Sequence, residues 1–195
     1  MKRCIALIIA IALMVPSAAM AQLARGIELF ERSEFEAAAQ VLSPLAKEGD
    51  VKAQYVLGVM YLNMMAQPPS ETAAAQLMIS AGEGGMDKAQ VELARMYREG
   101  QGVEQDFAKS FFWSIKAAEA GDVGAQLQVA DSLAFGYGVD RDSVEAYKWY
   151  EIAVHYWGSL AVNARDLVAE SMAADQIATA QQRAQSWIKA QAEKK

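Results

Sequence analysis

Two short stretches with paired glycines have the residue types of a phosphate-binding loop. Residues 100–106 read GQGVEQD and residues 136–142 read GYGVDRD. A phosphate site of this kind has a strand before the glycines, a helix after them and a third glycine three positions on. Here Gln105 and Arg141 occupy that third position, and no strand pattern precedes either stretch. We therefore expect no nucleotide cofactor and interpret both stretches as turns between helices.

Acid, base and nucleophilic catalysis need several side chains within hydrogen-bonding reach of one another. The chain has one histidine, His155, and no catalytic motif surrounds any of its serines. Paired carboxylates such as Glu28 and Glu31 fall on polar helix faces beside Arg32, which favours a solvated surface. The sequence accordingly predicts no catalytic residue.

Methionine thioethers bind soft copper, so a methionine cluster is a candidate metal site. Met60, Met64 and Met96 are the candidates, and all three fall on apolar helix faces. Methionine fills irregular gaps in protein cores, so this placement favours packing. We expect no metal site.

The first residues have the order of a secretory signal peptide. Lys2 and Arg3 precede an apolar run over residues 4–15, and the small residues Ala19 and Ala21 follow a proline. The run is too short to span a bilayer comfortably, so cleavage after Ala21 is expected, with an uncleaved anchor as the competing interpretation. Residues 1–21 are thus predicted to direct export to a bacterial periplasm or the medium, with no stable membrane insertion after cleavage.

Composition limits the partners of the exported chain. Cleavage would remove Cys4, the chain's one cysteine, so no disulfide is expected in an oxidising compartment. Loss of Lys2 and Arg3 would take the 18 basic residues to 16 against 24 acidic ones, a net charge of about −8. This negative charge disfavours binding to nucleic acid and to anionic lipid.

An internal repeat with an offset of 36 residues dominates residues 49–158. The segments 52–61, 88–97 and 124–133 align, and so do the two glycine turns. The aligned columns consist of alanines, glutamines, glycines and tryptophans. They are Ala53, Ala89 and Ala125; Gln54, Gln90 and Gln126; Gly49, Gly85 and Gly121; Gly102 and Gly138; and Trp113 and Trp149. Each unit has two stretches of helical periodicity, so stacked helix pairs are predicted.

The turn residues are expected to end one helix and start the next. Gly100 and Gly136 are predicted to adopt the left-handed conformation that ends a helix. Asp106 and Asp142 are predicted N-caps, and Asp142 with Glu145 has the spacing of a capping box. Small alanines allow close approach of the helix axes, and Trp113 and Trp149 are predicted to point inward.

The aligned columns resemble the Sel1-like repeat, a relative of the tetratricopeptide repeat. The pattern that carries the resemblance is A-x-x-x-L-G-x-x-Y, then G-x-G-V-x-x-D, then A-x-x-W-x-x-x-A-A-x-x-G. Residues 89–121 match almost throughout, with Ala94 and Ser110 in place of the usual glycine and alanine. The first unit has MAQPPS instead of the glycine turn, where Ser70 is the expected cap. The resemblance implies an all-α, right-handed superhelical solenoid of antiparallel helix pairs, and an exported bacterial member of the family.

The predicted organisation follows from these patterns. Residues 22–48 form a degenerate leading helix pair, with Ser33 as a candidate cap. Three repeats follow over 49–85, 86–121 and 122–158. Residues 159–195 form C-terminal capping helices, with apolar positions that include Leu167, Ala180 and Ala184.

The resemblance implies a non-enzymatic scaffold or adaptor that binds a protein or peptide, since members of the family mostly bind other proteins. The alternative is a cell-envelope enzyme or a peptidoglycan- or β-lactam-binding protein, although family members of that group carry cysteine pairs.

On the first helix of each repeat, positions six and ten residues after the column alanine point away from the stack. These predicted partner-binding residues are Val59 and Asn63, Arg95 and Glu99, and Asp131 and Phe135. Reversal of the Arg95 and Asp131 charges is expected to weaken capture and leave the melting temperature nearly unchanged, because exposed charges contribute little to folding.

Overall fold

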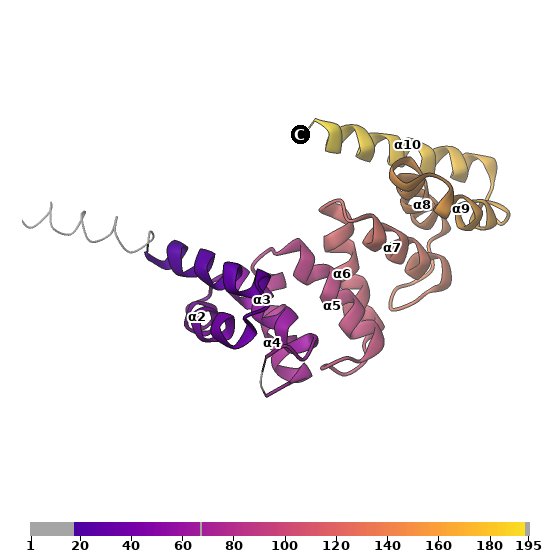
Figure 1. The fold of residues 1–195 in the computed structure, drawn as a ribbon. Coiled ribbons are helices and arrows are strands. Elements are labelled where there is room, and N and C mark those ends of the chain that lie inside the picture. The colour runs from indigo at the N-terminus through magenta and orange to yellow at the C-terminus, as the bar shows by residue number, and fades with distance from the viewer. Residues whose placement is uncertain (1–17, 67, 194–195) are drawn as a thin grey trace, which may run out of the picture. The chain divides into compact units, whose positions relative to one another are not determined.

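The computed structural model describes residues 18–66 and 68–193, and within those residues every regular element is a helix (Figure 1). This confirms the all-α prediction. The apolar run of the predicted signal peptide lies outside the described residues. Residues 18–31 form one helix, so cleavage after Ala21 would fall within its first turns.

The chain divides into two compact units, Met1–Ala89 and Gln90–Lys195. The first unit continues from the helix at 18–31 into α2 (Phe35–Lys47), α3 (Val51–Leu62) and α4 (Glu71–Glu83). The division falls inside α5 (Asp87–Glu99). The second unit contains α6 (Phe107–Glu119), α7 (Val123–Phe135), α8 (Ser143–Trp157), the 3₁₀ turn η1 (Gly158–Ala161), α9 (Val162–Ala169) and α10 (Ala174–Ala192). Within the units, α2 packs on α3, α3 on α4, α6 on α7 and α7 on α8, as expected for a series of helix pairs.

Short polar side chains start the helices. The side chain of Ser70 accepts from the Ala73 N–H, and that of Asp106 accepts from the Lys109 N–H. Asp142 accepts from two backbone N–H groups at the start of α8. All three predicted caps are confirmed. The predicted capping box is only half formed, because the Glu145 carboxylate pairs with other side chains instead of returning to the cap.

Two sequence predictions fail where a non-glycine residue adopts a positive φ. Ser33 (φ 64°) ends the helix at 18–31, and Glu34 takes the N-cap position without a side-chain bond, so Ser33 does not cap α2. Met64 (φ 57°) follows the end of α3 and is 67% exposed, so it is not buried as Met60 and Met96 each are in their own unit. In both places the helix closes by a backbone turn in which a left-handed residue lets the next N–H groups bond back to the last carbonyls.

The column alanines and tryptophans form the cores. In the first unit, Ala53 is fully buried against α2 and packs with Leu42 and Met60. In the second, Ala125 and Ala153 are buried in a cluster with Trp149. Trp113 and Trp149 are 6% and 3% exposed, which confirms that both point inward. Alanine at these positions lets the helix backbones approach closely, because a longer side chain would hold them apart.

The glutamine column forms a repeated hydrogen bond between helices. In the first unit, Gln54 Nε2 donates to the Ala46 carbonyl near the end of α2, at 3.1 Å. At the equivalent place in the second unit, the buried Gln126 donates to the Ala118 carbonyl near the end of α6, at 3.3 Å. These amides add a bond from the following helix to carbonyls that already accept from the backbone N–H groups of Gly49 and Gly121.

The second glycine of the turn has a role that the sequence reading missed. Gly136 (φ 81°) ends α7 in the left-handed conformation, as predicted. Gly138 (φ 73°) also lies directly against the backbone at the start of α6, where an added Cβ would meet the Phe107 carbonyl oxygen at 2.1 Å. The turn thus packs one repeat onto the previous one, and the close approach requires the absence of a side chain.

The C-terminal helices close the second unit. α9 and α10 both pack on α8, and the three helices lie together at the end of the chain (Figure 1). Ala180 and Ala184 are fully buried, and the Trp187 ring lies 5.7 Å from that of Trp149. Leu167 differs from the expectation: it is 58% exposed, because the helical face that it occupies is not covered by α8 or α10.

Candidate functional site

The six predicted partner-binding residues fall into three pairs, each in a different local setting. Val59 and Asn63 belong to the unit Met1–Ala89, and the other four belong to the unit Gln90–Lys195. Val59 is half-buried on α3. Asn63 is exposed at the end of that helix, where its side-chain amide donates to the Val59 carbonyl at 2.8 Å. The hydrogen bond between these two residues therefore lies within the last turn of α3.

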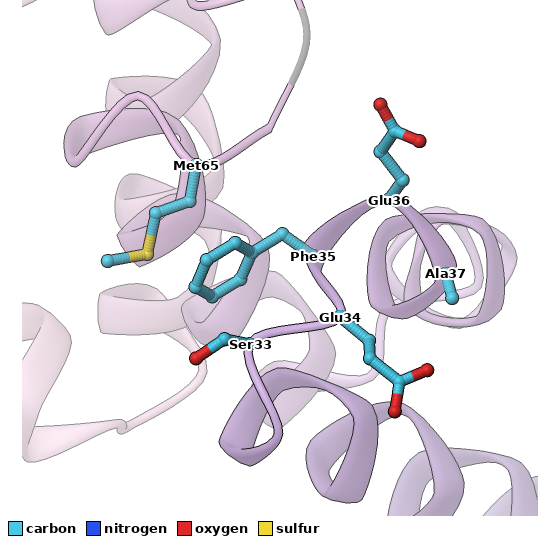
Figure 2. A pocket seen from close by; sticks show the side chains of 6 residues that line it. All are labelled: Ser33, Glu34, Phe35, Glu36, Ala37 and Met65. Atoms are coloured by element: carbon cyan, nitrogen blue, oxygen red, sulfur yellow. The ribbon is translucent and has the colours of Figure 1, made fainter.

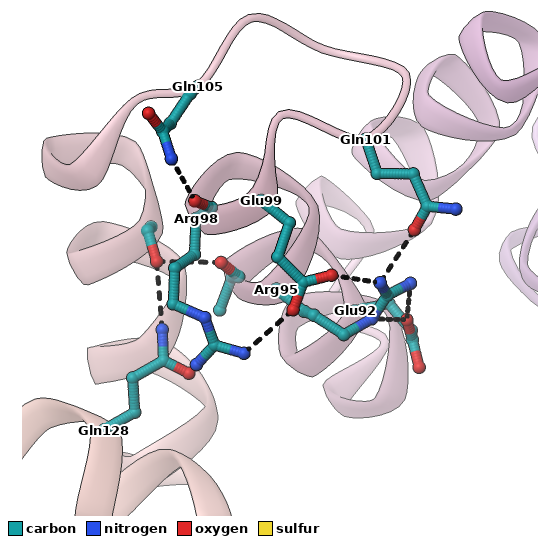
Figure 3. A network of polar contacts seen from close by, with 9 residues as sticks. Glu92, Arg95, Arg98, Glu99, Gln101, Gln105 and Gln128 are labelled. Carbon is teal, nitrogen blue, oxygen red and sulfur yellow. Dashed lines mark hydrogen bonds and ion pairs between the residues drawn. The ribbon is translucent and has the colours of Figure 1, made fainter.

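Arg95 and Glu99 belong to a polar network on α5 (Figure 3). Arg95 pairs with Glu92 at 3.0 Å and with Glu99 at 2.8 Å, and it also donates to Gln101 at 2.7 Å. The hydrogen bond from Arg98 lowers the pKa of Glu99 from its ordinary value, and the bond from Arg95 acts in the same direction. Arg95 is half-buried and fully engaged, so the premise that it is an unconstrained surface charge is wrong.

Asp131 and Phe135 are brought together at one cleft. They lie one turn apart on α7, and both are exposed. The cleft has a volume of about 230 Å³ and is lined by α7, α8 and α9. Its lining consists of one charged, three hydroxyl-bearing and five apolar residues. They are Asp131, Ser143, Tyr150, Ser171, Ala134, Phe135, Ala164, Leu167 and Val168.

A buried tyrosine fixes the acidic group of this cleft. The Tyr150 hydroxyl donates to the Asp131 carboxylate from the opposite helix, α8. Burial raises the pKa of Tyr150 far above its ordinary value, and the adjacent Asp131 raises it further, so the phenol remains a donor throughout the physiological range. Asp131 therefore accepts a hydrogen bond that joins α7 to α8. A basic residue at this position could not accept that bond, so reversing the charge would also lower folding stability. The expectation that reversal leaves the melting temperature unchanged is corrected accordingly.

An aromatic strip extends from the edge of the cleft, formed by Phe135, Tyr137 and Phe107. The Phe135 and Tyr137 ring centroids are 5.8 Å apart, and those of Tyr137 and Phe107 are 6.1 Å apart. The three side chains are between 43% and 53% exposed. The glycine turn positions the strip, since Gly136 and Gly138 hold Tyr137 between the end of α7 and the start of α6. Contiguous exposed aromatic area of this kind marks interaction surfaces.

A hollow of about 530 Å³ in the first unit is more open than the cleft and has fewer groups directed into it. It is lined by the link between the helix at 18–31 and α2, together with Met65. Figure 2 shows the Phe35 ring facing Met65, while the Glu34 and Glu36 carboxylates point away from that contact. No acidic group is directed at the apolar floor, so this hollow lacks the combination of charge and aromatic surface found in the cleft.

The remaining candidate catalytic and metal-binding side chains do not come together in one site among the described residues. His155 is exposed on α8, and its ring meets that of Tyr156 at 4.9 Å. Glu28 pairs with Arg25 at 3.5 Å and with Arg32 at 3.3 Å on an exposed helix face. Over residues 18–66 and 68–193, no three side chains among His, Cys, Asp and Glu come together as metal ligands. No helix in the same residues is long and apolar enough to cross a bilayer.

Sequence reasoning found two of the cleft's residues and missed the others. Tyr150 follows the repeat tryptophan directly, but no repeat column marks it, because the previous repeat has Ser114 at the equivalent position. Tyr137 had a detectable signal, because an aromatic residue stands in an exposed turn where the previous repeat has Gln101. Leu167 lies beyond the repeats, where no column indicates which side of the helix is covered.

Comparison with known proteins agrees with this architecture. Residues 51–86, 87–122 and 123–154 match the family model of the Sel1 repeat, which is more than half of the chain. No match was found among curated proteins.

Two solved structures are similar to the chain. One is c5321, a protective antigen present in uropathogenic Escherichia coli strains that displays an SLR fold. It has 29% sequence identity and a TM-score of 0.66, over 78% of this chain and 32% of that one. The other is a Sel1 repeat protein from Oxalobacter formigenes, with 26% identity and a TM-score of 0.68, over 75% of this chain and 60% of that one. The chain thus spans about a third of the first structure and three fifths of the second.

Proposed function

Because the chain belongs to the Sel1 repeat family, we propose that it is an exported, non-enzymatic scaffold that binds a protein or peptide partner at the cleft between α7, α8 and α9. Helical repeat arrays bind partners on surfaces that they shape by stacking, without catalytic machinery. The observation that carries the proposal is the exposed apolar border of the cleft. Phe135 and Leu167, 47% and 58% exposed, flank its opening from α7 and α9.

This border has the composition of a binding hot spot. Such sites combine large apolar or aromatic side chains with a few polar groups that fix orientation. Here the apolar groups are Phe135, Leu167 and the adjoining Tyr137, and the polar groups are Asp131 and the serines of the lining. Removal of Phe135 or Leu167 would take contact area from a partner and little from the core, since both side chains are about half exposed.

We predict that Phe135→Ala combined with Leu167→Ala abolishes capture of the partner. Immobilised protein would be incubated with cell-envelope extract, and captured proteins would be identified by mass spectrometry. A hot-spot residue is worth about 2 kcal/mol or more, so the double variant should lose at least tenfold in captured partner. The control is Phe112→Ala, which removes a side chain of the same type that is 50% exposed on α6, away from the cleft. Equal capture by the double variant and the control would reject the cleft as the binding surface.

Export is proposed from the charged, apolar and small-residue order of the first 21 residues. We expect protein recovered from the envelope fraction or the medium to begin at Gln22, and intact-mass spectrometry measures this directly. Substitution of Ala21 by Asp should block processing, because the peptidase site accepts small residues only. A dominant species that retains residues 1–21 would favour the uncleaved anchor instead.

A further inference from the structure

The charge distribution of the cleft suggests which side chain it accepts. Asp131 is the one charged residue among those that line it. Its carboxylate accepts from Tyr150, and a carboxylate has about four lone-pair sites, so most of its accepting capacity is left. No ion pair within residues 18–66 and 68–193 involves Asp131, although it is exposed.

The cations on α8, on α9 and in the glycine turn have other acceptors. Arg165 on α9 pairs with Glu151 at 2.8 Å and with Asp166 at 2.7 Å. Lys148 on α8 pairs with Glu145 at 2.7 Å. Arg141, on the glycine turn, donates through Nε to the Phe135 carbonyl at 3.1 Å. The carboxylate is therefore held in place by Tyr150, and none of the described cations forms an ion pair with it.

The position of the aromatic ring selects among cations. Phe135 lies four residues after Asp131, on the same face of α7, and lines the same cleft. A planar guanidinium can pair with a carboxylate and lie against an aromatic face at the same time. An ammonium group is a compact and more strongly hydrated charge, so it gains less from such a surface. The arrangement therefore favours arginine over lysine.

Building on the proposed function, we propose that the cleft binds an arginine side chain of an extended partner segment whose neighbouring residues are apolar. The guanidinium would meet the Asp131 carboxylate and the Phe135 ring. The flanking apolar side chains would lie on the aromatic strip of Phe135, Tyr137 and Phe107, whose successive ring centroids are 5.8 and 6.1 Å apart, so the strip is at most about 12 Å long. Consecutive residues of an extended chain rise about 3.3 Å, so the strip accommodates at most about four of them.

The test uses a defined probe, the peptide acetyl-Ala-Phe-Arg-Phe-Ala-amide, and its twin with citrulline in place of arginine. Citrulline keeps the shape of the side chain and removes the charge. Nitrogen-15-labelled protein, expressed from its full sequence, would be titrated with each peptide and followed by NMR. We expect chemical-shift changes confined to residues 131–137, 143–150 and 164–171 and to Phe107, with the citrulline peptide binding at least about tenfold more weakly, as expected for a charge-assisted bond. Equal binding of the two peptides, or changes centred elsewhere, would overturn the inference.

A matched pair of variants tests the named carboxylate. Asp131→Asn removes the charge and keeps an oxygen that can accept from Tyr150, so folding is preserved while affinity for the arginine peptide should fall about tenfold. Asp175→Asn makes the same chemical change on α10, outside the cleft, and should alter affinity less than about twofold. If the two variants bind equally well, Asp131 does not recognise the arginine and the inference fails.

The two proposals can fail separately. If the arginine peptide does not bind, but Phe135→Ala with Leu167→Ala still abolishes capture from envelope extract, the arginine inference is rejected and the scaffold proposal stands. If the double variant also captures normally, both are rejected. A partner recovered from the extract that binds through a segment without arginine likewise overturns the inference alone.

Discussion

Gly138→Ala is expected to destabilise the unit Gln90–Lys195 by about 2–5 kcal/mol. A left-handed residue other than glycine costs roughly 1–2 kcal/mol, and overpacking against a rigid neighbour adds typically 1–3 kcal/mol. At Gly138 (φ 73°) the new Cβ would meet the Phe107 carbonyl oxygen at 2.1 Å and the Ala108 amide nitrogen at 2.5 Å. These are backbone atoms at the start of α6, so relief requires the turn to move away from the preceding repeat.

Gly100→Ala is a control with the same backbone conformation. Gly100 also has φ 73°, but an added Cβ there has no atom closer than 3.5 Å. Its substitution should cost only the conformational part, about 1–2 kcal/mol. Urea unfolding followed by circular dichroism would measure both variants against the unsubstituted protein. Equal destabilisation by the two variants would show that close packing of the turn on α6 contributes nothing.

Trp149→Ala is expected to destabilise the same unit by about 3–5 kcal/mol, the usual cost of truncating a large buried aromatic side chain. Trp149 is 3% exposed within the core cluster of the second unit. Its ring meets Trp187 on α10 edge-on at 5.7 Å, and the Lys148 ammonium lies 4.5 Å from its centroid. The substitution would leave a cavity between α8 and α10 and loosen the C-terminal helix from the repeats.

The same helix provides a matched control in Trp157, which is 51% exposed near the end of α8. Trp157→Ala removes the same side chain from solvent-facing surface and should cost about 0.5 kcal/mol or less. Both variants can be compared in urea unfolding, with near-ultraviolet circular dichroism reporting on the aromatic packing. A Trp149→Ala protein as stable as Trp157→Ala would contradict the assignment of the repeat tryptophan to the core.

Most of the fold could be predicted because the same residue types recur at equivalent positions in three repeats. Column alanines, inward tryptophans and the caps Ser70, Asp106 and Asp142 are local or periodic features, and local chemistry decides them. The failures lie outside the columns. The residue type of Ser33 predicts a cap, but Ser33 (φ 64°) closes the preceding helix in a left-handed conformation and Glu34 takes the N-cap position.

The candidate site was predictable only in part. Asp131 and Phe135 were identified because helical periodicity places them on the outer face of α7, and they do share one cleft. The same rule selected Arg95, whose neighbours Glu92 and Glu99 bind it within α5. Periodicity states which way a side chain points, but it does not state which groups nearby already satisfy its charge.

The sequence by itself determined the all-helical repeat, its offset of 36 residues and the residues that begin and end its helices, because these follow from interactions between positions close in the chain. Only the tertiary structure decided that Tyr150 reaches Asp131 from the next helix, that Leu167 faces solvent beside Phe135, and that Gly138 lies against Phe107. Tyr150 and Asp131 are 19 residues apart in the chain, and Gly138 and Phe107 are further apart still, so each contact depends on how separate elements approach one another. Their distances are set by how whole helices pack, and no local pattern encodes that.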